Sequence, residues 1–429
     1  MGKRKKRIVY LIGAGASIAV DPVVPGMDNF LDCALNNLEG PEDASCVLAL
    51  EKLRELATFP FSGHLETPWP LSGLHDERRL TQFKGFYKTF LSERAQHKKP
   101  GYNNLESIFD EATMGWHKDG GEAHRRLTTL IGWLFSKLDQ KLSTSLTSSK
   151  NPYRILGGWL SEKAASEYQH LLISFNYDVW LEQALFDSHV GGRRLWHPSD
   201  GYCMPSHSTL FGGYLGPSDR EQSRRQQANH SKGDIGTMVP LEARLFRNIP
   251  KRSRIKILKP HGSLSWVRPV EKPYSTPPLL LLDVDEIHTN TLAGNVVHLE
   301  KGQELINIKQ QTTSPDRYFP LIVPPATVKA RSGRVFWEIQ KELDSQINSA
   351  DVVVVIGWSM PDTDIDSRSR MQGIISRRNK QLEKLIVCNF HQPDPFYTKF
   401  ENLFWPETEP IFWDEGFNRD FVEKCLTCL

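Results

Sequence analysis

Glycines and polar residues that could do chemistry recur directly after short apolar runs of this sequence. A glycine turn can approach an anion closely, an amide can hold a water or a hydroxyl group, and an imidazole can exchange a proton near neutral pH. These groups stand at Gly13-Ala14-Gly15-Ala16-Ser17, Asn176 with Asp178, His261, Gly357 with Ser359, and Asn389. Groups of these kinds that converge on one place predict a ligand site.

Five apolar runs precede these groups and predict the elements that position them. The runs are rich in Val, Ile and Leu and mostly lack polar alternation, which is typical of strands covered on both faces. They are Ile8–Ile12, Leu171–Ser174, Ile255–Leu258, Val352–Ile356 and Leu385–Cys388, and helical patterns between them include Glu122–Leu142 and Arg334–Ile347. Strands separated by helices predict an α/β fold, a Rossmann-like doubly wound parallel sheet whose strands all end at one ligand-binding edge.

The turn after the first run has two interpretations. Gly13 and Gly15 let the backbone approach a phosphate, which the N-terminus of the following helix would also attract. The dinucleotide fingerprint has a third glycine where this chain has Ile18, so the turn departs from that of ordinary hydride-transfer folds. The structural alternative is that small residues let a helix pack closely against a strand.

The spacing of the runs predicts a core with a large helical insertion. Roughly 160 residues separate the first two predicted strands, far more than one crossover needs. We expect a core of residues 1–39 and 165–429 and a mainly helical insertion of residues 40–164, with helices near Leu80–Phe90 and Asn104–Thr113. Residues 190–250 are rich in Gly, Ser, Arg and Gln, so we expect a long loop or lid there.

Composition excludes several classes of protein. Charged residues make up 24% of the 429 residues, and the formal net charge of +2 gives no general attraction to nucleic acid, so direct sequence-specific nucleic-acid binding is not expected. We interpret the basic run Lys3–Arg7 as a solvated flank of the first strand, with nucleic acid or an acidic partner as the alternative. No apolar run is long enough for a membrane span or a signal peptide, so we expect no membrane association and a cytoplasmic location. Six scattered cysteines with one C-x-x-C pair, Cys425 and Cys428, do not predict a metal site.

Several motifs, in their order along the chain, resemble those of one family. The GAGAS turn at 13–17 is followed by FNYD at 175–178, KPHGS at 259–263, VVVIGWSMPDTD at 353–364 and a strand-end Asn389. This set is similar to that of the sirtuin-like proteins of bacterial antiviral defence. The resemblance covers about residues 7–390 and includes IVPPATVK at 322–329.

The resemblance implies an NAD⁺ glycohydrolase that cleaves the nicotinamide–ribose bond, releases nicotinamide and ADP-ribose, and acts as an abortive-infection effector. NAD⁺ is then a substrate rather than a resident cofactor, and no metal is expected. The implied catalytic residues are Asn176, His261 and Asp178, and the implied NAD⁺-binding residues are Gly13, Ala14, Gly15, Ser17, Asp28, Gly357, Ser359 and Asn389. In the family, the glycine turn holds the pyrophosphate, the asparagine lies beside the nicotinamide ribose, and the last three positions contact the adenosine half.

The implied reaction meets elementary chemical requirements. Nicotinamide is already a cationic leaving group, so its departure needs no general acid, whereas the oxocarbenium-like ribose needs stabilisation and a positioned nucleophile. Asn176 can hold a water or a ribose hydroxyl, and His261 can deprotonate either one. Asp178 either stabilises the positive charge or orders its loop, and either Asp28 or Asn29 enters the site.

The chain also departs from the protein-deacylating sirtuins. Those enzymes carry a zinc module with two separated C-x-x-C pairs, which this chain lacks. The segment with Pro25, Asp28 and Phe30 keeps these residue types at altered spacing and lacks the arginine of the deacylases. Water is therefore the expected nucleophile, and deacylation is disfavoured. A non-catalytic module that binds NAD⁺ or ADP-ribose is the main alternative, against which the presence of both Asn176 and His261 argues.

The resemblance also implies control by other subunits. Relatives of this kind are held in check by oligomerisation or by a partner protein. We expect a homo-oligomer, with a HerA-like hexameric ATPase as partner or, alternatively, a short Argonaute. The aromatic-rich segment after Asn389 is interpreted as closure of the core, with a subunit interface as the alternative.

Overall fold

A six-stranded parallel sheet forms the centre of the protein, with the strand order β13-β12-β11-β1-β2-β5. Its strands are β1 (Lys6–Ile12), β2 (Tyr168–Ser174), β5 (Lys256–Leu258), β11 (Val352–Ile356), β12 (Lys384–Cys388) and β13 (Ile411–Trp413). The computed structural model describes residues 5–56, 71–97, 105–114, 121–163, 168–196, 202, 254–269, 279–282, 295–297, 305–307, 318–323, 334–360, 365–378 and 380–429.

The strand order is that of a Rossmann fold. From β1 the chain builds β2 and β5 on one side, then returns to place β11 on the other side of β1 and continues outward through β12 and β13. Strands β1 and β11 are therefore neighbours at the point where the winding reverses. All the strands expected from the apolar runs lie in this sheet, and the predicted α/β fold is confirmed.

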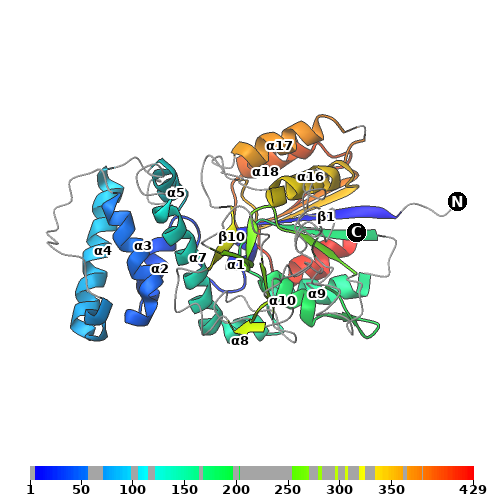
Figure 1. Ribbon diagram of the computed structural model, residues 1–429. Coiled ribbons are helices and arrows are strands. Elements are labelled where there is room, and N and C mark those ends of the chain that lie inside the picture. The colour runs from blue at the N-terminus through cyan, green and yellow to red at the C-terminus, as the bar shows by residue number, and fades with distance from the viewer. Residues whose placement is uncertain are drawn as a thin grey trace, which may run out of the picture.

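Helices cover both faces of this sheet, which explains why its strands are continuously apolar. Figure 1 shows α16, α17 and α18 over one face and α9 and α10 over the other. All five residues of β11 are buried, as strands sandwiched between helices require. The covering helices are α9 (Pro152–Lys163), α10 (Trp180–Asp187), α16 (Arg334–Asn348), α17 (Ile365–Ile375) and α18 (Asp394–Phe404).

The described residues of the long connection between β1 and β2 are mostly helical. It contains α1 (Ala14–Ile18), α2 (Phe30–Asn37), α3 (Ala44–Glu55), α4 (Glu77–His97), α5 (Leu105–Met114), α7 (Glu122–Lys141) and α8 (Ser143–Thr147), with 3₁₀ turns at Pro41–Asp43 and Leu71–His75. Helices α2 to α5 and α7 stand beside the sheet as a separate layer (Figure 1). Helix α2 packs against α4 and α7, and α9 packs against α10, so the helical layer includes residues before 40 and ends before α9.

A second, antiparallel sheet lies next to the first and was not expected from the sequence. Its strand order is β10-β6-β7-β8-β9. The strands are β6 (Gly262–Pro269), β7 (Leu279–Leu282), β8 (Asn295–Val297), β9 (Leu305–Asn307) and β10 (Tyr318–Ile322). Strand β6 begins directly after His261, so this sheet anchors one side of the predicted site.

The remaining elements are short. They are the hairpin β3 (His189–Val190) and β4 (Arg193–Arg194), a π turn at Phe421–Cys425 and a 3₁₀ turn at Leu426–Cys428. Of the loop or lid predicted over 190–250, the structure describes residues 190–196 and Tyr202, which forms a bridge with Ile257, and the rest lies outside the described residues. Within the described ranges, no helix is long and apolar enough to cross a membrane.

The turns after β1 and β11 pack backbone against backbone. A Cβ atom on Gly13 would lie 2.5 Å from Trp358 Cα, and one on Gly15 would lie 2.9 Å from Gly357 Cα. Gly357 has a φ of +61°, and its own Cβ would lie 2.2 Å from the backbone nitrogen of Ala16. The three glycines are therefore required by this close approach.

Gly357→Ala tests this packing. The left-handed backbone alone costs an L-residue about 1–2 kcal/mol, and the clash with Ala16 adds to it, so the free energy of unfolding should fall by more than about 2 kcal/mol. Urea denaturation measures the change. Gly85→Ala is the control, because Gly85 lies inside α4 with open space around it, and this variant should gain about 0.5–1 kcal/mol. Equal stability of the two variants would contradict the packing argument.

Candidate functional site

The predicted site residues lie at one edge of the central sheet, because parallel strands all end on the same side. Of these residues, Asn176 and Asp178 follow β2, His261 follows β5, and Gly357 follows β11. This edge at the β1–β11 switch point is where open α/β sheets bind ligands. The structure thus brings together groups that are up to several hundred residues apart in the sequence.

The glycine turn is held in place by its own amide groups. Gly13 N–H donates to Ile356 O at 3.0 Å, and Gly15 N–H donates to Gly357 O at 2.8 Å. Ala16 N–H donates back to Gly13 O at 3.0 Å, while Ala14 is exposed at the start of α1. The glycines therefore serve close packing of two turns, and the phosphate contact stays a prediction.

Asn176 is hydrogen-bonded to the glycine turn. Its Nδ2 donates to Gly13 O and to Ser17 Oγ, both at 2.9 Å, and lies 3.3 Å from the hydroxyl of Tyr153. Ser17 Oγ donates to Asp178 Oδ2 at 2.8 Å and lies 3.0 Å from the Tyr153 hydroxyl. All four side chains are buried. We call Ser17, Tyr153, Asn176 and Asp178 the Asn176 network.

The Asp178 side chain is buried at the carboxyl edge of the sheet. Its Oδ1 accepts a hydrogen bond from Trp180 N–H at 3.2 Å, at the start of α10, while Oδ2 is bound by Ser17. Burial raises the pKa of Asp178, and the nearby positive charge of Lys259 and the Ser17 hydroxyl act in the opposite direction. Of the two roles considered for Asp178, this geometry favours the ordering of the loop.

His261 is half-buried against the aromatic residues of the β2 turn. Its ring centroid lies 5.3 Å from that of Phe175 and 6.4 Å from that of Tyr177. Phe175 in turn stacks on Trp358 at 5.0 Å and an interplanar angle of 15°. The imidazole is therefore placed by a layer of rings that joins the ends of β2, β5 and β11.

The other predicted ligand contacts are less closely connected. Ser359 is exposed beside the buried Trp358. Asn389 Oδ1 accepts a hydrogen bond from Phe390 N–H at 2.9 Å and so shapes the turn after β12. Asp28 is exposed before α2 and takes no part in the Asn176 network. The motif residues 324–329 and 361–364 lie outside the described residues.

Sequence reasoning missed two parts of this site. Tyr153 reaches the Asn176 network from α9, and no local pattern distinguishes it from an ordinary core tyrosine. Lys259 lies in the KPHGS motif but was given no role, and it is fully buried against Glu182 of α10. A charged residue at the end of an apolar strand is the signal that could have drawn attention to it.

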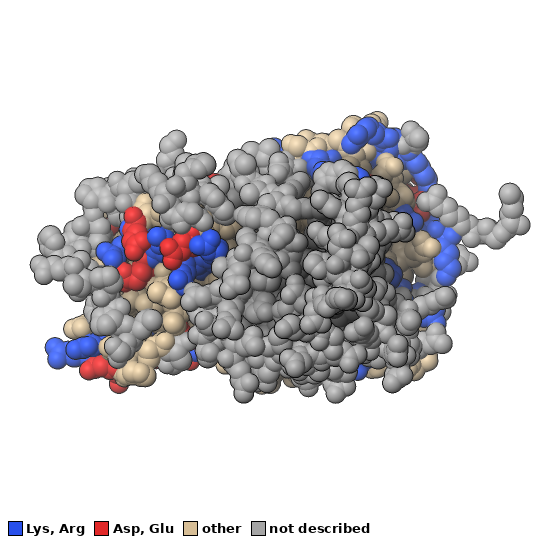
Figure 2. Space-filling view, viewed as in Figure 1, with Lys and Arg blue, Asp and Glu red and all other residues tan. Residues whose placement is uncertain are grey.

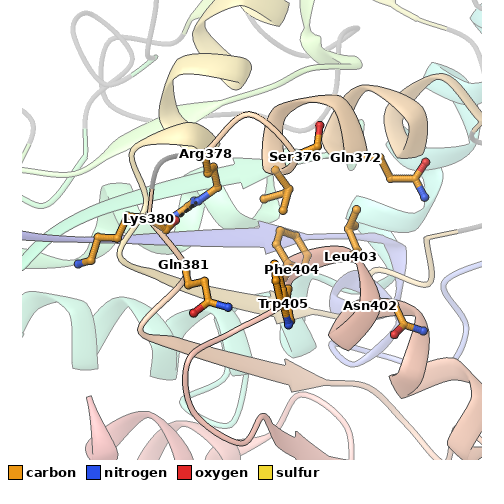
Figure 3. A pocket seen from close by; sticks show the side chains of 10 residues that line it. Gln372, Ser376, Arg378, Lys380, Gln381, Asn402, Leu403, Phe404 and Trp405 are labelled. Carbon is orange, nitrogen blue, oxygen red and sulfur yellow. Dashed lines mark hydrogen bonds between the residues drawn. The ribbon is translucent and has the colours of Figure 1, made fainter.

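A hollow of about 520 Å³ lies elsewhere, beside the segment that enters β12 and the end of α18. Its lining includes Gln381, Asn402 and the exposed Trp405 (Figure 3). Lys and Arg side chains gather near the end of α17 in Figure 2. Arg378 there donates to Ile347 O and Ala350 O, both at 2.6 Å, and so caps α16. This hollow lies at the amino ends of the strands and contains none of the predicted site residues.

No family model matches the sequence, and no curated protein matches it. The strand order and the arrangement of side chains at the carboxyl edge therefore carry the functional argument. In the part of the chain that the structure describes, no group of three or more His, Cys, Asp and Glu side chains could hold a metal ion.

Tyr153→Phe tests the Asn176 network. Removing the hydroxyl takes a hydrogen-bond partner from both Ser17 and Asn176, which are buried, so the free energy of unfolding should fall by about 1–3 kcal/mol. Chemical denaturation measures the loss. Tyr397→Phe is the matched control, since the buried Tyr397 hydroxyl has no hydrogen-bond partner among the described residues, and its removal should change stability little. Equal effects in both variants would contradict the assigned bonds.

Proposed function

We propose that the protein is an NAD⁺ glycohydrolase that releases nicotinamide and ADP-ribose. The observation that carries the proposal is the direct hydrogen bond from Asn176 Nδ2 to Gly13 O, with His261 on the adjoining strand end. The bond joins the amide to the glycine turn beside the switch point of a Rossmann sheet, where dinucleotides bind in open α/β folds, and the imidazole lies at the end of the next strand, β5. The resemblance of the motifs to sirtuin-like defence proteins supports the same activity.

The residues present can fulfil the chemical roles this reaction needs. The bonds made by Asn176 Nδ2 fix the orientation of the amide, and we assign its Oδ1 to a ribose hydroxyl or the attacking water. His261 accepts a proton from the attacking water as the nicotinamide–ribose bond breaks. Bond cleavage transfers the electron pair to the nicotinamide ring, which departs neutral, and water oxygen forms the new bond to the ribose carbon. ADP-ribose is the second product.

The biological setting follows from the resemblance alone. We propose that NAD⁺ depletion serves an abortive-infection response. Control by a homo-oligomer, by a HerA-like hexameric ATPase or by a short Argonaute is part of this proposal, as is a cytoplasmic location. Acyl-peptide-dependent turnover would instead favour the NAD-dependent deacylase.

A non-catalytic module that binds NAD⁺ or ADP-ribose is the second candidate. It is favoured by the internal bonding of the site, since Asn176, Ser17 and Asp178 are buried and bound to one another. Such a module would bind the dinucleotide without turnover and regulate a partner. Calorimetric binding of NAD⁺, measured beside turnover, separates the two candidates.

His261→Ala is the decisive variant. The purified protein is incubated with NAD⁺, alone and with the candidate partners, and nicotinamide and ADP-ribose are quantified. Loss of the general base should lower kcat by about 10²–10⁴-fold with NAD⁺ binding retained. His189→Ala is the control, because His189 is exposed in β3 and should leave turnover unchanged. Wild-type protein without turnover under every condition, or an active His261→Ala variant, would overturn the proposal.

A further inference from the structure

A buried ion pair lies directly behind the candidate site. Lys259 Nζ lies 2.9 Å from Glu182 Oε1, and both side chains are fully buried. The same ammonium donates to the backbone carbonyl of Asp178 at 2.6 Å. Lys259 therefore ties the end of β5 both to α10 and to the turn after β2.

Stability alone gives little reason for this ion pair. Removing two charges from water is costly, and replacement of buried ion pairs by apolar residues of similar volume is often neutral or stabilising. Burial raises the pKa of Glu182, and the charge of Lys259 opposes that shift. What the pair does supply is geometry, because the short ionic contact holds the end of β5 against α10 while the same ammonium binds the Asp178 carbonyl after β2.

The connection from this ion pair to the predicted catalytic groups is short and stiff. Pro260 separates Lys259 from His261, and proline restricts its own φ as well as the conformation of the residue before it. On the other side, the Asp178 carbonyl lies two residues after Asn176. Leu264 N–H also donates to Tyr177 O at 2.9 Å, which joins the same two segments beyond His261.

We propose that Lys259 and Glu182 are positioning residues that hold His261 against the turn that carries Asn176. The inference rests on the proposed NAD⁺ glycohydrolase activity. The ion pair does not touch the substrate, and it acts by fixing the distance between the imidazole and the amide. A displacement of about 1 Å between two catalytic groups, here the imidazole and the amide, lowers the rate by up to about a hundredfold.

The double variant Lys259→Met/Glu182→Leu removes the charges and keeps side-chain volume. We expect a KM for NAD⁺ within about twofold of wild type and a kcat lowered about tenfold to a hundredfold. Two opposing changes set the thermal stability of this variant: the buried charges are removed, and the Asp178 carbonyl loses its bond from Lys259. Hydrogen–deuterium exchange should rise in peptides that cover residues 175–178 and 259–264 and stay unchanged in β1 and β11.

The matched control is a second buried ion pair, in the helical layer. Arg94 Nη2 lies 3.0 Å from Glu111 Oε2, and the two side chains are 1% and 10% exposed. The double variant Arg94→Met/Glu111→Leu should leave kcat and exchange at the site unchanged. An equal loss of kcat in both double variants would show a general effect of charge removal and overturn the positioning role.

The outcomes separate this inference from the proposed function. A folded Lys259→Met/Glu182→Leu variant with wild-type kcat and exchange overturns the positioning role while the NAD⁺ activity stands. If the wild-type protein does not cleave NAD⁺, the proposed function fails, and exchange at residues 175–178 and 259–264 alone decides whether the pair positions these segments. If the double variant does not fold, Glu182→Gln, which keeps the side-chain shape, carries the same comparison.

Discussion

The contact between the turns after β1 and β11 is the constraint on which the rest of the structure depends. Gly13 and Gly15 lie against the backbone of Gly357 and Trp358, and the N–H groups of both glycines donate to carbonyl oxygens of Ile356 and Gly357. Only residues without Cβ atoms permit this approach. The contact sets where both central strands end. It thereby fixes the positions of the turns that follow β1 and β11 at the carboxyl edge of the sheet.

The Asn176 network, whose polar groups are hydrogen-bonded, lies next to these turns. Asn176, Ser17, Tyr153 and Asp178 are buried, and each has hydrogen-bond partners within the network or next to it. Buried polar groups left unpaired would be costly, so the hydrogen bonds among these side chains stabilise the network. Above it, His261 packs on aromatic rings and remains partly exposed. A partly exposed imidazole beside a buried, hydrogen-bonded network is an arrangement that suits proton transfer at a fixed place.

Sequence patterns predicted the central elements closely. The run Val352–Ile356 is β11 to the residue, and the pattern at Glu122–Leu142 gives α7 (Glu122–Lys141). These elements are long or continuously apolar, so their periodicity is readable. Strand β13 and the strands β7 to β9, each three or four residues long, were not predicted. The helical insertion was also predicted, but the place of α2 and α9 depends on packing rather than on their own residues.

By itself, the sequence determined the fold class and the kinds of groups that end its strands, because apolar periodicity and glycine turns are local properties of the chain. Only the tertiary structure decided which of those groups bind one another. Tyr153 is hydrogen-bonded to Ser17, 136 residues away in the sequence, and Asn176 to Gly13, 163 residues away. The strand order brings these residues together. Likewise, the burial of Lys259 against Glu182 follows from how α10 packs beside β5. Such contacts depend on the relative placement of whole elements, which no local pattern encodes.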